Sequence, residues 1–111
     1  MPKLCNIDID NRQGIFKRLE KFVITITEKF SIKNIYLYGS FATGEIHEGS
    51  DIDLIIIGDF KERFFDRIGK ILRMTDLPIE PLVYTESEFK GMLENGNPFL
   101  KDIIEKGRKL I

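Results

Sequence analysis

Two aspartates, Asp51 and Asp53, stand at the mouth of an apolar run that continues through residues 54–57. Such a run predicts a buried strand, and side chains of a strand alternate between its two faces, so both carboxylates are expected to point the same way. Their Cα atoms would lie about 6.6 Å apart. Carboxylates so placed repel each other unless a cation lies between them, and their oxygens suit a hard ion such as Mg²⁺.

A glycine and a serine, Gly39 and Ser40, follow another short apolar run at residues 35–38. Glycine permits a close approach of the backbone, and serine is a favoured first residue of a helix whose N–H groups face an anion. A pair of metal-binding carboxylates beside an anion pocket is suited to the transfer of a phosphate-containing group. Separately, an Asp-x-Asp or a Gly-Ser is more often a solvated strand end or a loop.

The elements that would position these residues follow from the apolar periodicity. Helical spacing over residues 15–30, after a cap at Asp10 or Asn11, predicts an amphipathic helix. A second helix is expected after Asp59, with Phe60, Phe64 and Phe65 in its apolar stripe. The remaining expected elements are strands at 35–38, 51–57 and 79–85, helices opened by Thr85 and Pro98, and a short strand at 108–111. This order predicts an α/β (α+β) fold, a small mixed β-sheet with helices mainly on one face.

The strand at residues 79–85 carries a third acid, Glu80, near its start. Buried acids usually have a partner or a metal, although an acid at a sheet edge in water is the alternative. Pro81 cannot donate to a ladder, so one side of this strand is expected to be unpaired there.

Gly39-Ser40, ten intervening residues and Asp51-Ile52-Asp53, with an apolar strand before and after, resemble the signature of the nucleotidyltransferase superfamily that includes DNA polymerase β. Ala42, Gly44 and the run Ser50-Asp51-Ile52-Asp53-Leu54 resemble its minimal nucleotidyltransferase branch. The resemblance implies a nucleotidyltransferase palm. It also implies that Glu80 completes the catalytic and metal site with Asp51 and Asp53, and that Gly39 and Ser40 bind the nucleotide.

The function implied by this resemblance is Mg²⁺-dependent transfer of a nucleoside monophosphate, AMP from ATP, to an acceptor hydroxyl. Two Mg²⁺ ions are expected. Minimal members often act as antitoxins that modify a tyrosine of a HEPN toxin partner, which makes a protein acceptor the expectation here. Many relatives carry an arginine after the Gly-Ser, where this chain has Phe41. Arg63, Arg67 or a partner would then supply the countercharge.

Length and composition argue against several other classes of protein. The chain has 111 residues, the usual size of one domain, so a single domain over residues 1–111 is expected. Seventeen basic against 18 acidic residues argue against nonspecific gripping of nucleic acid. The lone Cys5 and the lone His47 argue against a zinc site, and a solvated loop position is favoured over a catalytic one for His47. No apolar run is long enough to span a membrane, so a cytoplasmic protein is expected.

Two alternatives to an enzyme remain open at this point. The first is a non-catalytic binding module, an antitoxin that neutralises its partner by contact alone. The second is a nucleotide sensor that binds metal and NTP without transferring a group. Loss of one aspartate would separate transfer from contact-only binding, because only transfer depends on charge stabilisation in the transition state.

Overall fold

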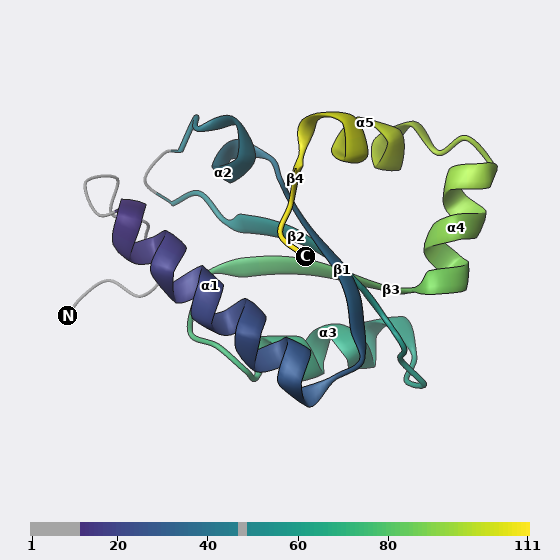
Figure 1. Cartoon of the computed structure of the whole chain (residues 1–111), viewed down its shortest axis with the longest axis horizontal. Coiled ribbons are helices and arrows are strands. Elements are labelled where there is room, and N and C mark those ends of the chain that lie inside the picture. The colour runs from purple at the N-terminus through teal and green to yellow at the C-terminus, as the bar shows by residue number, and fades with distance from the viewer. Residues whose placement is uncertain (1–11, 47–48) are drawn as a thin grey trace.

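The sheet that organises the molecule has four strands in the order β3-β2-β1-β4. A computed structural model describes residues 12–46 and 49–111 (Figure 1). The cap expected at Asp10 or Asn11, and His47, lie outside the described residues. The strands are β1 (Ile32–Tyr38), β2 (Ile52–Gly58), β3 (Ile79–Thr85) and β4 (Arg108–Lys109). β1 runs antiparallel to β2 and to β4, whereas β3 runs parallel to β2, so the sheet is mixed as expected.

One face of the sheet is covered by α1 (Arg12–Lys29), α2 (Ser40–Thr43) and α3 (Phe64–Leu72). In Figure 1, α1 crosses in front of the sheet. Its apolar stripe packs on the inward side chains of β1 and β2 because helical spacing places those side chains on one side. Buried members of this cluster include Leu19, Ile26, Ile35, Leu37, Leu54 and Ile56.

The opposite face is covered in part by α4 (Glu86–Glu94) and α5 (Pro98–Lys106). A smaller cluster lies there, and its buried members are Ile55, Ile57, Phe89, Leu100 and Ile103. β2 therefore contributes buried side chains to both faces, as its continuous apolar run predicts for a central strand. The expected class, a small mixed sheet with α-helices packed on it, is confirmed.

Local signals set the ends of the last two helices where they were expected. The hydroxyl of Thr85 accepts from the N–H of Glu88, whose carboxylate in turn accepts from the N–H of Thr85, which makes a capping box. Asn97 caps α5 ahead of Pro98, and Gly107 follows its last residue. None of the described helices is long and apolar enough to cross a membrane.

The helix expected after Asp59 begins later, because α3 starts at Phe64. The N–H of Asp59 donates to the carbonyl of Ser31, so the chain turns away from β2 before the helix. Phe60 is buried from this turn, with its ring 5.8 Å from that of Phe30. Phe65, expected in the apolar stripe, is 81% exposed. The expected apolar stripe was therefore wrong for two residues. Phe60 packs on Phe30 from the turn before α3, and Phe65 is in α3 but points to solvent.

Candidate active site

The three acids come together at one end of β2 and β3. Asp53 lies opposite Glu80 across the parallel pair and opposite Tyr38 across the antiparallel pair. The side chains of Tyr38, Asp53 and Glu80 therefore form a row across β1, β2 and β3. Since side chains alternate along a strand, Asp53 lies on the face of Ile55 and Ile57, the face turned away from α1. Asp51 immediately precedes β2 and is exposed.

The carboxyl group of Glu80 is influenced by both aspartates. Glu80 is exposed and lies beside Asp53 in the register of β2 and β3. The hydrogen bond with Asp51 raises the pKa of Glu80 most, and burial and the two negative charges raise it further. The pKa of Asp53 is also raised, mainly by burial. A cation bound between these acids would favour their charged forms.

The donor set fits a hard divalent ion. Within residues 12–46 and 49–111 no group of three His, Cys, Asp or Glu side chains is already arranged to hold a metal. Carboxylate oxygens are the ligands that Mg²⁺ prefers, and a cation relieves the repulsion between neighbouring carboxylates. Asp51, Asp53 and Glu80 are therefore chemically suited to Mg²⁺ as a group.

Gly39 lies directly against the carboxylate of Asp53. Its backbone has φ 72° and ψ −153°, a region that side chains strongly disfavour. A Cβ built on Gly39 would overlap Oδ2 of Asp53. The absence of a side chain at Gly39 thus permits both the positive φ of the turn and the close approach of Asp53.

Ser40 opens α2 directly after this glycine. The N–H groups of Ala42 and Thr43 donate to the carbonyl of Gly39. Phe41 is buried and packs edge-on against Phe16 of α1, with ring centroids 5.9 Å apart, so α2 is anchored to the core. The first N–H groups of a helix have no intrahelical partner, which directs those of Ser40 and Phe41 outward from the start of α2.

The sequence model of the nucleotidyltransferase domain matches residues 18–111. This chain belongs to that family. A candidate protein adenylyltransferase of Methanocaldococcus jannaschii is 33% identical over 97 residues, 85% of this chain and 95% of the relative. A second protein of the same organism and description is 28% identical over 88 residues, 79% of this chain and 85% of the relative. The nucleotidyltransferase domain is thus an enzyme fold of the transferase class.

Two solved structures share the fold. A candidate nucleotidyltransferase of Sulfolobus solfataricus aligns with TM-score 0.61 and 22% identity, over 82% of each chain. A toxin–antitoxin structure with AMP-PNP aligns with TM-score 0.55 and 19% identity, over 83% of this chain and 72% of that one. At these identities the likeness concerns the fold.

Tyr38 is a residue of the nucleotidyltransferase domain that sequence reasoning had placed only in a strand. Burial raises its pKa to about 12, with smaller contributions from the charges of Asp53, Glu80 and Tyr84. Its ring packs edge-on against Phe99 of α5 at 5.6 Å. Tyr38 therefore stays protonated and forms the wall of the site on the side opposite Glu80. Its position just before Gly39 was the available signal, but its place beside Asp53 depends on the pairing register.

Arg67 is not free to reach a nucleotide, contrary to one expectation for the countercharge. It is buried, and its guanidinium donates to both carboxylate oxygens of Glu88 at 2.7 and 3.2 Å. It also donates to the carbonyls of Glu62 at 2.8 Å and Val83 at 3.1 Å. Arg63, one helical turn earlier, is exposed.

Proposed function

We propose that this nucleotidyltransferase domain transfers AMP from ATP to a hydroxyl group of a protein, with Mg²⁺ held by Asp51, Asp53 and Glu80. The convergence of these three carboxylates beside Gly39 carries the proposal. The description of the relatives as protein adenylyltransferases supports AMP as the transferred group and a protein as the acceptor.

In the proposed reaction a bond forms between the acceptor oxygen and the α-phosphorus, and the bond to pyrophosphate breaks. Bound Mg²⁺ would neutralise the phosphate charge and lower the pKa of the attacking hydroxyl. Glu80 would share that Mg²⁺, or would instead take the proton of the hydroxyl directly as a general base. The N–H groups and the hydroxyl at Ser40, with Gly39, would hold the terminal phosphates.

The acceptor that we propose is a tyrosine of a HEPN-type toxin, with this domain as the antitoxin. The structural neighbour described as a toxin–antitoxin with AMP-PNP supports a nucleotide and a toxin partner for this fold. A cytoplasmic location would supply both ATP and the toxin. Since Arg67 is bound to Glu88, the countercharge for the triphosphate would come from Arg63 or from the partner.

Asp53→Asn tests the proposal, with Asp76→Asn, an exposed loop acid, as the control. ATP with Mg²⁺ should raise the melting temperature of the wild type and of Asp76→Asn, and should scarcely shift Asp53→Asn. In Mg²⁺-free buffer Asp53→Asn should be as stable as the wild type or slightly more so, because a carboxyl repulsion is removed.

Incubation with α-labelled ATP, Mg²⁺ and a toxin encoded beside this chain measures the transfer itself. Label on the toxin that is lost with Asp53→Asn is the expected result, because charge stabilisation in the transition state is removed. Toxin neutralisation without label, unchanged in Asp53→Asn, would instead identify a binding module. A Mg²⁺-dependent thermal shift without either effect would identify a nucleotide sensor.

A further inference from the structure

The face that carries the acids continues along β3 into a groove. Because side chains alternate, Glu80, Leu82 and Tyr84 lie on one face of β3. Tyr84 lies four positions after Glu80, which is roughly 13 Å along a strand. The groove holds about 380 Å³, and its lining residues are Phe64, Tyr84, Ser87, Glu88, Gly91, Met92 and Asn95.

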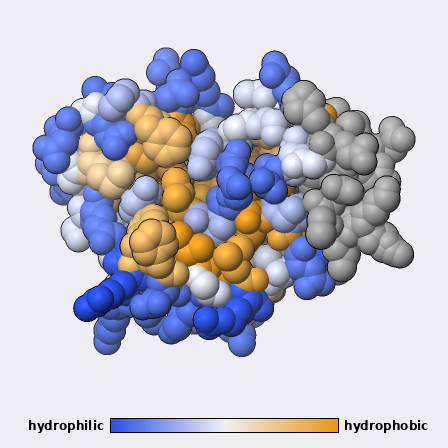
Figure 2. Space-filling model, turned by 180° about the vertical axis from the view of Figure 1, so that it is seen from behind, coloured by the Kyte–Doolittle hydropathy of each residue, from blue (hydrophilic) through white to orange (hydrophobic). Residues whose placement is uncertain are grey.

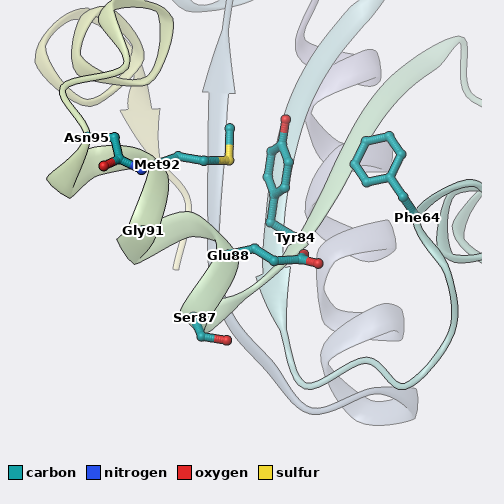
Figure 3. Close-up of a pocket in the computed structure, with 7 residues that line it drawn as sticks. All are labelled: Phe64, Tyr84, Ser87, Glu88, Gly91, Met92 and Asn95. Carbon is teal, nitrogen blue, oxygen red and sulfur yellow. The ribbon is translucent and has the colours of Figure 1, made fainter.

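The lining combines the apolar and aromatic side chains of Phe64, Tyr84 and Met92 with the polar side chains of Ser87, Glu88 and Asn95. Figure 3 shows the ring of Tyr84 between Met92 and Phe64. The rings of Phe64 and Tyr84 are 5.5 Å apart, and Phe65, whose ring is 5.5 Å from Phe64, is 81% exposed. Figure 2 shows apolar side chains reaching the surface on the side turned away from α1. Exposed aromatic side chains beside a groove are typical anchors of a protein interface.

The charges of this groove favour a polypeptide over a nucleic acid. Its seven lining residues include no Lys or Arg, whereas phosphate binding depends on such cations. The carboxylate of Glu88 is already neutralised by Arg67. Ser87 and Asn95 offer neutral hydrogen-bonding groups suited to a peptide backbone.

The outer edge of β3 is closed to an added strand. Pro81 has no N–H to donate, and the carbonyl of Val83 already accepts a hydrogen bond from the guanidinium of Arg67. A bound segment must therefore be held by its side chains rather than by extension of the sheet. The groove offers such a side chain a partly apolar recess on this face.

We propose that the groove binds the acceptor protein through an apolar or aromatic side chain located three to five residues from the modified hydroxyl. The inference rests on the proposed function for the position of that hydroxyl beside Glu80. An extended segment advances at about the same 3.3 Å per residue as β3, so the distance from Glu80 to Tyr84 sets this spacing. The groove would thus select the acceptor, and the carboxylates would act on it.

Gly91 provides a variant that fills the groove without disturbing its walls. A Cβ built there has nothing within 4 Å, so the side chain of Gly91→Leu enters open space. Leucine also favours a helix interior over glycine, so α4 should be at least as stable. Gly69→Ala in α3 is the matched control, since a Cβ there makes only an ordinary contact, 3.5 Å from Arg73.

The probes are fluorescein-labelled peptides of about twelve residues with one tyrosine and a leucine four residues to either side, against the same peptides with alanine in place of leucine. Fluorescence anisotropy reports binding, and labelled ATP reports transfer. One of the two leucine peptides, with leucine either before or after the tyrosine, should bind about tenfold more tightly than the matching alanine peptide, as burial of one leucine side chain predicts. Gly91→Leu should abolish that preference, and Gly69→Ala should retain it.

The thermal shift with Mg²⁺ and ATP separates failure of this inference from failure of the proposed function. An intact shift in Gly91→Leu together with lost peptide preference supports the groove as the acceptor site. Equal binding of leucine and alanine peptides, or no peptide binding, overturns the inference while leaving nucleotide transfer open. Leucine-selective binding by a wild type that shows neither a thermal shift nor transfer would support the peptide-binding groove and contradict the proposed transferase function.

Discussion

Gly39 shows how a single residue joins the two motifs of the site. Its positive φ and its contact with Asp53 both depend on the missing side chain. Gly39→Ala should lower the free energy of unfolding by about 1–3 kcal/mol, the usual cost of a residue held in that backbone region. It should also abolish the thermal shift with Mg²⁺ and ATP, because the new methyl group displaces the carboxylate. Urea unfolding and differential scanning fluorimetry measure the two effects.

Gly96→Ala is the control for this prediction. Gly96 also has a positive φ, 77°, but its Cβ would have only Lys101 Nζ near it, at 4.0 Å. It should lose stability and keep the nucleotide-dependent shift. A normal shift in Gly39→Ala would show that Gly39 does not position Asp53.

At the level of elements, the Arg67–Glu88 pair joins α3 to the start of α4 across the edge of β3. Arg67 lowers the pKa of Glu88 through a side-chain hydrogen bond, and the Thr85 backbone N–H adds to the effect. An acid whose pKa is lowered on folding stabilises the protein above its ordinary pKa. That contribution is lost as the pH falls from about 4.5 through the lower pKa of the folded state.

Glu88→Gln should therefore flatten the loss of stability between pH 5 and pH 3 that the wild type shows. It should also be less stable than the wild type near pH 7, because the buried Arg67 loses its charged partner. Glu86→Gln, an exposed acid at the start of the same helix, should retain the wild-type pH dependence. Urea unfolding as a function of pH measures both, and parallel curves for wild type and Glu88→Gln would contradict the assignment.

On the scale of the whole molecule, β2 connects the two apolar clusters. Leu54 and Ile55 are adjacent, are both fully buried and face opposite sides of the sheet. Leu54→Ala and Ile55→Ala should each lower the free energy of unfolding by about 2–5 kcal/mol, since each leaves a cavity. Ile104→Ala, at a position 41% exposed, should change it by less than about 1 kcal/mol.

Both core variants should unfold in a single transition, because one strand serves both clusters. This outcome is also what we expect if residues 1–111 form one domain. Denaturation followed by circular dichroism and by tyrosine fluorescence would test it. Two separate transitions, one for each variant, would show that the faces of the sheet unfold independently.

Features that depend on neighbouring residues could be predicted from the amino-acid sequence. The span of β3 from Ile79 to Thr85 and the capping box of Thr85 follow from alternation and from side-chain hydrogen bonds over a few residues. The shared direction predicted for Asp51 and Asp53 rests on the same alternation. The Gly-Ser and Asp-x-Asp spacing was also sufficient for the family, because both motifs lie close together in the chain.

Features that join distant segments could not be predicted in this way, because they depend on how the strands pair and how the helices pack. The meeting of Glu80 with Asp53 depends on the parallel register of β2 and β3, and the position of Tyr38 depends on the antiparallel register of β1. Arg67 looked like one cation of a solvated helix, yet β3 and α4 enclose it. Phe60 left its expected helix because Phe30 packs against it from another element. Periodicity describes which side of an element is apolar, but register and packing decide what lies opposite.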